Sequence, residues 1–183
     1  MAKDGLREAI SDFGAIVDVK KKLVTRKEMT DEFSGKTDLR LHLGCGLDIQ
    51  PGYINIDHPK AILPDEVLRI NFESHWLPFE DNSVIEIKAI HLLEHITNLI
   101  PLMNEFNRVM KRNGELIIET PLAPFPEAFQ DPTHVRFITE QTWGYFCSSD
   151  GLWQVYGKNY GIVGWRILMK SQSGHNLRAI LRK

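Results

Sequence analysis

The sequence has few cysteines and no excess of charge of one sign. Cys45 and Cys147 are far apart in the chain of 183 residues, so they form neither a disulfide framework nor a four-ligand zinc site by themselves. Lys and Arg number 22 and Asp and Glu number 24, which leaves a formal charge of -2 and no basic excess of the kind that nucleic-acid binders carry. The sequence therefore predicts a reducing compartment and no nucleic-acid partner.

Long apolar runs are also missing. No stretch approaches the roughly 18–20 consecutive apolar residues that cross a bilayer, and the first residues lack the apolar core of a signal peptide. These absences predict no membrane span and a cytoplasmic location. Hydrophobic residues make up 43% and charged residues 25% of the chain, which is ordinary for a globular protein with a single domain.

Residues 1–37 differ in their residue pattern from the rest of the chain. They are predicted to form an N-terminal helical extension to a domain that spans residues 38–183. Four apolar residues at steps of four, three and four share one helical face: Leu6, Ile10, Phe13 and Val17. That face needs a partner surface. We expect it to pack on the main domain, while a substrate lid or a dimer contact, and with it a homo-oligomer, stays open.

From Asp38 onward, short apolar runs alternate with amphipathic stretches, as strands and crossover helices of a parallel sheet do. Five strands are predicted at 39–43, 53–56, 66–70, 84–90 and 115–119, with a helix over 99–110. Two further strands, at 161–169 and 177–181, are predicted to form an antiparallel hairpin at one edge. The fold class is therefore α/β, with a mostly parallel seven-stranded sheet.

The ends of the first two strands indicate a ligand site. Glycines at 44 and 46 follow the first strand, where they let the backbone turn tightly and approach a ligand. Asp57 ends the second strand, where a carboxylate accepts hydrogen bonds from both hydroxyls of a ribose. Ile49 stands where a dinucleotide fingerprint has its third glycine, so a nucleoside is predicted and a pyrophosphate cradle is not. The link between the two strands is too short for a full crossover helix.

Over residues 39–146 the sequence resembles the class I S-adenosylmethionine-dependent methyltransferases. Five motifs carry the resemblance: Leu41-His-Leu-Gly-Cys-Gly46, Pro51-Gly-Tyr-Ile-Asn-Ile-Asp57, Leu77-Pro-Phe-Glu-Asp-Asn-Ser83, His91-Leu-Leu-Glu-His95 and Phe106-Asn-Arg-Val-Met-Lys-Arg-Asn-Gly114. It implies a Rossmann-like single domain with S-adenosyl-L-methionine as cofactor. The cofactor-binding residues that it implies are Gly44, Cys45 and Gly46 at the methionine portion, Asp57 at the ribose, Asn71 and Phe72 at the adenine, and His91 beside the methionine end.

The segment from His91 to His95 also matches the inverted zinc-protease pattern H-x-x-E-H, which places two histidines one turn apart on a helix. Against zinc, the segment directly follows a strand at the ligand-binding edge, and no motif distinguishes an acidic third ligand downstream. The sequence therefore predicts no metal. His95 is a candidate for substrate binding, with a partly buried, hydrogen-bonded histidine as the alternative.

Residues 120–136 follow the fifth strand and contain four prolines, which prevent a regular helix or a central strand. Such a loop lies where an acceptor would approach the methyl group. His134 is predicted to act as the catalytic base, with Asp131 holding its ring, and Arg136 to grip an anionic or hydroxylated acceptor. In the alternative, Asp131 caps the turn that follows it and His134 merely bonds to it.

After this loop, Thr139 is expected to cap a helix whose apolar side holds Trp143, Phe146 and Cys147. We expect the two aromatic side chains to lie in the core and not to form a platform for the substrate.

Exclusion narrows the acceptor. The sequence lacks the Asn/Asp-Pro-Pro-aromatic motif of amino-methylating DNA enzymes and the Pro-Cys nucleophile of cytosine C5 enzymes. For a methyltransferase, these absences leave a small molecule, a saccharide or a lipid-linked sugar as the acceptor, with O-methylation favoured over N-methylation. Two other classes stay open: an inactive methyltransferase-like binding protein and another Rossmann-like nucleotide-binding protein.

Overall fold

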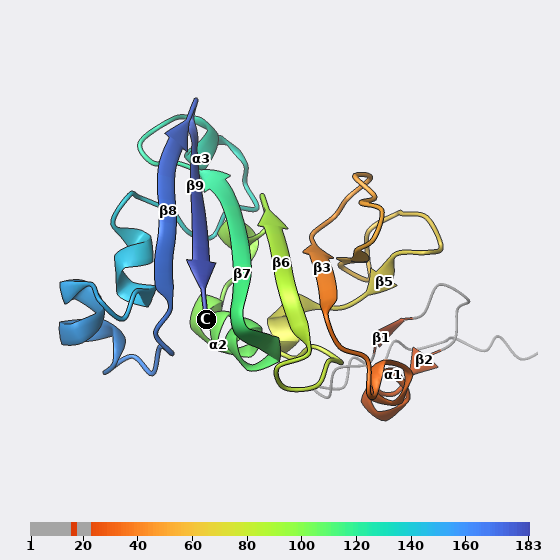
Figure 1. The fold of residues 1–183 in the computed structure, drawn as a ribbon. Helices are drawn as coiled ribbons and strands as arrows, with labels where there is room; N and C mark the ends of the chain where they lie inside the picture. The colour runs from red at the N-terminus through yellow and green to blue at the C-terminus, as the bar shows by residue number, and fades with distance from the viewer. Residues whose placement is uncertain (1–15, 18–22) are drawn as a thin grey trace, which may run out of the picture.

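The computed structural model describes residues 16–17 and 23–183. Its centre is a seven-stranded sheet in the order β5-β4-β3-β6-β7-β9-β8 (Figure 1). The strands are β3 (Leu39–Leu43), β4 (Ile54–Asp57), β5 (Leu68–Arg69), β6 (Val84–Ile90), β7 (Met110–Pro121), β8 (Arg166–Ser173) and β9 (Asn176–Arg182). Strands β3 to β7 are parallel to one another, and β9 runs antiparallel between β7 and β8. The predicted α/β class and the antiparallel C-terminal hairpin are confirmed.

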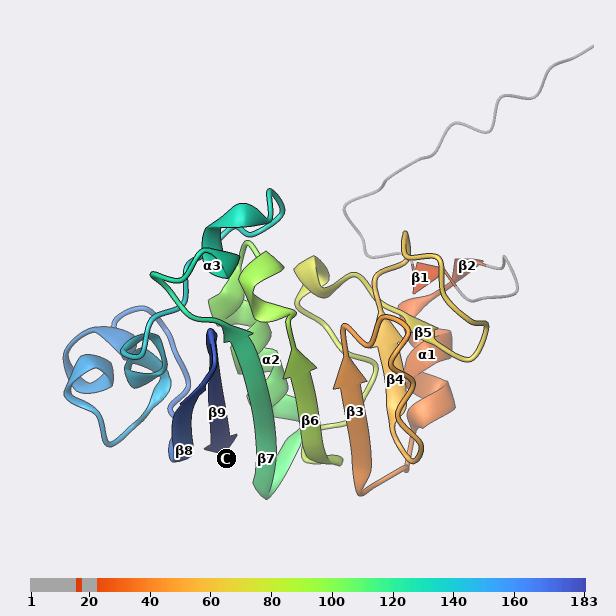
Figure 2. The same cartoon turned by 90° about the horizontal axis from the view of Figure 1, so that it is seen from above.

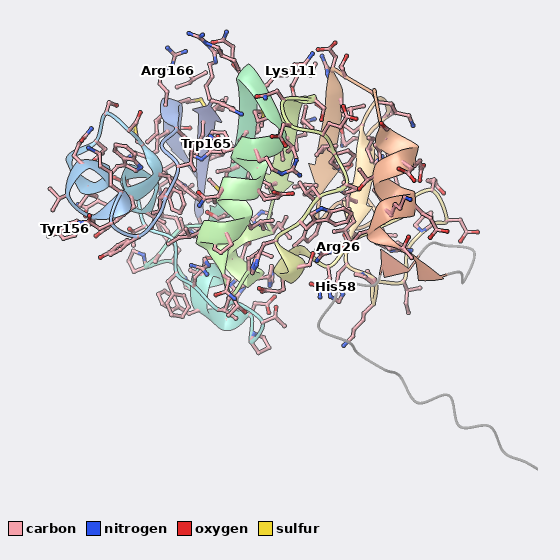
Figure 3. The ribbon with its side chains drawn as sticks, turned by 90° about the horizontal axis from the view of Figure 1, so that it is seen from below. Arg26, His58, Lys111, Tyr156, Trp165 and Arg166 are labelled. Carbon is pink, nitrogen blue, oxygen red and sulfur yellow. The ribbon has the colours of Figure 1, made fainter. Side chains whose placement is uncertain are left out.

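Two helices, α1 (Arg26–Phe33) and α2 (Leu99–Val109), lie on the same face of the sheet (Figures 2 and 3). Helix α1 begins with a capping box between Thr25 and Glu28, and it buries Met29 and Phe33 in the core. Helix α2 buries an apolar stripe that includes Leu102 and Phe106. No helix of the described part of the chain covers the opposite face, so the domain has two layers where parallel sheets usually have three.

The sheet face without helices, called the bare face below, results from the short links between strands. The link from β3 to β4 contains turns and no helix, as its length predicted. Side chains along β6 alternate accordingly: Ile87 and Ala89 are fully buried beneath the helices, whereas Glu86 and Lys88 on the other face are half-buried.

Several expected elements differ in the structure. The helix expected over residues 6–17 lies outside the described residues except for its end, where Val17 pairs in a short strand, β1 (Ile16–Val17), with β2 (Leu23–Val24). Strand β8 begins only at Arg166, and β5 is two residues long. The domain boundary at residue 38 stays a prediction.

The prediction that Thr139 caps a helix is wrong. A 3-10 segment, η3 (Thr142–Phe146), begins later, and no side chain caps it. The backbone N–H of Thr139 donates to the Thr142 hydroxyl, so this hydroxyl closes a turn before the segment. Trp143, Phe146 and Cys147 are buried, as expected of core residues.

The remaining short elements are the 3-10 turns η1 (Phe72–Ser74) and η2 (Leu93–His95), the helix α3 (Glu127–Gln130) and the π-helical segment η4 (Trp153–Gly157). Within the described residues, no helix has both the length and the apolar character that a bilayer span requires.

Candidate cofactor and acceptor site

A pocket of about 400 Å³, the strand-end pocket, opens at the carboxyl ends of β3, β4 and β6. The arrowheads of β3, β6 and β7 point to this edge of the sheet in Figure 2, where α3 also lies. The lining residues are Gly44, Asp57, His58, Asn71, Phe72, Glu73, His91, Leu92, His95 and Ile96. The structure therefore brings together six of the predicted site residues from four separate segments: Gly44, Asp57, Asn71, Phe72, His91 and His95.

The glycine turn after β3 is held against the Asp57 carboxylate. Asp57 Oδ2 accepts a hydrogen bond from Gly46 N at 2.7 Å, and Oδ1 accepts one from His58 N at 2.6 Å. Both glycines have left-handed backbones, with φ of 66° at Gly44 and 52° at Gly46. A Cβ at Gly44 would come within 3.2 Å of Leu92, whereas a Cβ at Gly46 would meet nothing within 4 Å. The space beside Gly46 is therefore open to a ligand.

Cys45 does not line the strand-end pocket. Its side chain is only 3% exposed, and its thiol contacts the carbonyl of Gly46. Burial, followed by the nearby Asp57 charge, raises the pKa of Cys45 to about 11, so the thiol is neutral at physiological pH. Cys45 therefore contributes to the site through its backbone in the glycine turn and not through its thiol.

Two residues after β5 form another wall. The Asn71 side chain accepts a hydrogen bond from Glu73 N at 3.0 Å and caps η1, and the buried Phe72 follows it. Glu73, which sequence reasoning missed, accepts a hydrogen bond from Thr97 N at 2.6 Å and so ties η1 to the segment before α2. Its position three residues beyond the predicted third strand was the only signal for it.

His91 and Glu94 form a pair at the end of β6. His91 has a left-handed backbone, with φ of 50°, which is uncommon outside glycine and typical of functional positions. Its Nδ1 lies 3.3 Å from Glu94 Oε1, and this hydrogen bond raises the pKa of His91. Glu94 is 1% exposed, and sequence reasoning did not include it among the site residues.

The loop after β7, the proline-rich loop (residues 122–138 in the structure), places its polar residues differently from the expectation. Asp131 Oδ1 accepts hydrogen bonds from Thr133 N at 2.8 Å and from the Thr133 hydroxyl at 2.6 Å, and these bonds lower the pKa of Asp131. His134 Nδ1 lies 3.1 Å from Ala128 O. The Asp131 carboxylate thus caps the turn, as the alternative had it, and a backbone carbonyl holds the His134 ring.

His134 nevertheless reaches the strand-end pocket through His95. The two rings meet edge to face with centroids 4.8 Å apart. Val135 N donates to Glu94 O at 3.0 Å, which fastens the loop to η2.

Arg136 links the proline-rich loop to the segment before α2. Its Nε and Nη2 donate to Ile96 O at 2.9 and 2.5 Å, and Nη2 also donates to Thr97 O at 2.7 Å. The same side chain lines a second cavity of about 340 Å³, the tyrosine pocket, together with Thr97, Asn98, Leu99, Ile100, Pro101, Thr142, Tyr145, Phe146, Tyr160 and Ile162. The rings of Tyr145 and Tyr160 stand nearly parallel there, at 10°.

Residues 35–118 match the protein family described as "Methyltransferase domain". The chain contains a class I S-adenosylmethionine-dependent methyltransferase domain. S-adenosylmethionine is its methyl donor. The strand-end pocket fits this group, because it has an ordinary ligand-site volume, the backbone of Gly44 in its wall and the Asp57 carboxylate at the end of β4.

Solved methyltransferase structures share the fold. A SAM-dependent methyltransferase from Aquifex aeolicus is 16% identical with a TM-score of 0.51, over 85% of this chain and 88% of that one. One from Archaeoglobus fulgidus is 15% identical with a TM-score of 0.52, over 87% and 95%. A 16S rRNA (adenine(1408)-N(1))-methyltransferase from Catenulisporales acidiphilia, solved with its cosubstrate SAM, is 12% identical with a TM-score of 0.53, over 92% and 96%. The search of curated proteins gave no match.

Proposed function

We propose that this methyltransferase transfers the methyl group of S-adenosylmethionine to a hydroxyl oxygen of a small molecule or a saccharide. One observation supports this choice above others: the His134 ring lies edge to face against His95 at the wall of the strand-end pocket. An imidazole in that place can reach the acceptor beside the methyl donor and serve as a general base toward its hydroxyl group.

We assign the donor's contacts to the glycine turn and the strand ends. The backbone of Gly44, Cys45 and Gly46 passes the methionine portion, and Asp57 accepts hydrogen bonds from the ribose hydroxyls. Asn71 and Phe72 flank the adenine, and His91 lies beside the methionine end. When bound, S-adenosylmethionine supplies a methyl group made electrophilic by its sulfonium charge. The chain's contribution is to hold the acceptor oxygen in line with that group.

On the acceptor side, His134 and Asp131 have separate roles. The His134 Nδ1–H donates to Ala128 O, which leaves Nε2 to receive the acceptor's proton. Asp131 is a positioning residue: it holds the Thr133 hydroxyl, which in turn contacts His95 Nδ1 at 2.9 Å. His95 is then the side chain through which the acceptor is held near the pocket.

The tyrosine pocket suits a ring with hydroxyl groups. Tyr145 and Tyr160 offer flat apolar faces with polar tips, and Arg136 contributes a positive charge to the same lining. These features support a saccharide or another hydroxylated compound as the acceptor.

Turnover tests the proposal. S-adenosylhomocysteine release is measured with a panel of hydroxylated small molecules and sugars, and with RNA and DNA oligonucleotides as competing acceptors. Once an acceptor is found, we expect His134→Ala to lower turnover by about 10² to 10⁴, the usual worth of a positioned base, with S-adenosylmethionine affinity within a few-fold. His175→Ala, which removes an exposed histidine bonded to Glu127, serves as the control and keeps full turnover.

Two results would contradict the proposal. Turnover with oligonucleotides alone would overturn the acceptor class. Near-normal turnover of His134→Ala, or a fall in its thermal midpoint that accounts for the lost activity, would overturn the role of His134.

A further inference from the structure

Three side chains at the mouth of the strand-end pocket form a cluster of metal-ligating groups. Glu94, His95 and His134 bring one carboxylate oxygen and two ring nitrogens within 4.8 Å of one another. Glu94 and His95 belong to η2, and His134 belongs to the proline-rich loop. The backbone bond from Val135 N to Glu94 O fixes the two segments side by side.

Both histidine rings are oriented through Nδ1. His134 Nδ1 lies 3.1 Å from Ala128 O, and His95 Nδ1 lies 2.9 Å from the Thr133 hydroxyl oxygen. The Thr133 hydroxyl donates its proton to Asp131, so its oxygen accepts from His95. Each ring therefore carries its proton on Nδ1 and keeps a lone pair on Nε2, which is the supported state of a metal-ligating histidine.

Glu94 supplies a buried carboxyl group that the described residues leave half satisfied. Its Oε1 lies 3.3 Å from His91 Nδ1, but its Oε2 is buried without a hydrogen-bond partner in the described part of the chain. A buried carboxylate oxygen with no partner is costly. A cation held by this carboxylate would remove that cost.

We propose that Glu94, His95 and His134 form a binding site for one divalent transition-metal ion, zinc being the ion that the donors suit best. Two imidazoles and a carboxylate with an open fourth position are a ligand set of zinc, whereas calcium and magnesium prefer oxygen ligands throughout. Bonds of about 2.0–2.2 Å to zinc place ligand atoms about 3.5 Å apart, so the cluster closes by roughly 1 Å on binding, within the reach of side-chain rotation.

This site differs from the one that the sequence pattern suggests. The pattern H-x-x-E-H pairs His91 with His95 across one turn of an α-helix, but η2 is a 3-10 turn of three residues and His91 lies outside it. His91 faces Glu94 and Glu119. His134, which lies 39 positions beyond His95 in the chain, takes the place that the pattern gives to His91.

Metal binding does not require methyl transfer, but its effect on the reaction rests on the proposed function. An ion at this site takes the Nε2 lone pair with which His134 would accept the acceptor's proton. The general-base role proposed for His134 therefore belongs to the metal-free chain.

Zinc titration of the full chain, with any affinity tag removed and without cofactor or acceptor, tests the site. Calorimetry is expected to show one zinc ion per chain, and elemental analysis after dialysis the same ratio. Outer-shell changes weaken metal sites by about 10- to 100-fold, so loss of a direct ligand in His134→Gln should weaken binding by at least about 100-fold. His175→Gln removes an exposed histidine beside Glu127 and is the matched control, with unchanged binding.

Thr133→Val provides a second variant that removes no ligand. It takes away the hydroxyl that orients His95, and we expect zinc binding to weaken about 10- to 100-fold. If His134→Gln does not fold, this variant and the visible spectrum of a cobalt-loaded chain decide the matter. Equal zinc binding by wild type and His134→Gln, unchanged affinity in folded Thr133→Val, or zinc lost in His175→Gln would each overturn the site. Failure of the metal site leaves the proposed methyl transfer standing, because the titration contains neither donor nor acceptor.

Discussion

At the scale of single residues, Asp57 is the side chain to which we assign the ribose hydroxyls. We predict that Asp57→Ala weakens S-adenosylmethionine binding more than tenfold, because hydrogen bonds to a charged group contribute about 1.5–3 kcal/mol each. Calorimetry measures the affinity, and a thermal melt shows whether the Gly46 turn survives the loss of its partner. Asp57→Asn, which keeps one acceptor oxygen, should bind with intermediate affinity. Unchanged affinity in Asp57→Ala would remove this residue from the site.

Cys45 offers a prediction on pH. Because burial and the Asp57 charge raise the pKa of its thiol to about 11, the fraction of thiolate is small at neutral pH and grows about tenfold per pH unit until the pKa is approached. Alkylation of Cys45 by iodoacetamide should therefore be slow at neutral pH and accelerate steadily in alkaline buffer. Mass spectrometry of the peptide that contains Cys45 follows the reaction, with the unfolded chain as the reference. Fast modification at neutral pH in the folded protein would contradict the assignment.

At the scale of elements, the proline-rich loop depends on Arg136 for its attachment to the start of α2. The guanidinium makes three hydrogen bonds to the carbonyls of Ile96 and Thr97, and a lysine ammonium cannot reproduce this fork. We predict that Arg136→Lys lowers the free energy of unfolding by about 1.5–3 kcal/mol, the usual range for a charge-assisted hydrogen bond. Urea unfolding measures the loss, and Arg166→Lys on the exposed side of β8 is the control. An unchanged midpoint would show that the loop is held by other contacts.

At the scale of the whole molecule, the domain has one covered and one bare sheet face. The bare face carries charged pairs such as Arg178 with Glu119 and Arg182 with Glu115, and Lys88 lies over the ring of Tyr53. Long polar side chains of this kind shield the apolar surface beneath them while their charged ends stay in water. These side chains therefore cover part of the sheet face that carries no helix.

Neighbouring isoleucines on β7 test this arrangement. Ile118 is 1% exposed beneath the helices, whereas Ile117 is half-buried on the bare face. We predict that Ile118→Ala lowers the free energy of unfolding by about 2–5 kcal/mol, as large-to-small changes in a core do, and that Ile117→Ala costs less than half as much. Urea unfolding of both variants gives the comparison. Equal losses would mean that the bare face is covered in solution.

The strands show how far the sequence reaches. Val84–Ile90 and Leu39–Leu43 were predicted with the bounds that the structure has, because their alternating apolar residues record a local period. Strand β7 was predicted too short, since its start at Met110 follows α2 without a break and the polar residues 111–113 carry no strand signal. The cap predicted at Thr139 is wrong for another reason: the Thr142 hydroxyl accepts a hydrogen bond from Thr139 N and closes a turn there, so the 3-10 segment begins only at Thr142.

The sequence by itself determined the α/β class, the mostly parallel sheet with its antiparallel hairpin, and the placing of the glycine turn and Asp57 at one edge. These depend on local period, on backbone freedom at glycine and on the rule that parallel strands end at one edge. Only the tertiary structure decided which side chains meet at that edge. Asp131 bonds to Thr133 and not to His134, and His134 joins His95 and Glu94 from a distant segment. Such pairings depend on how a loop without periodic structure folds back onto η2. Contacts between segments far apart in the chain produce no regular residue spacing, so the sequence pattern does not predict them.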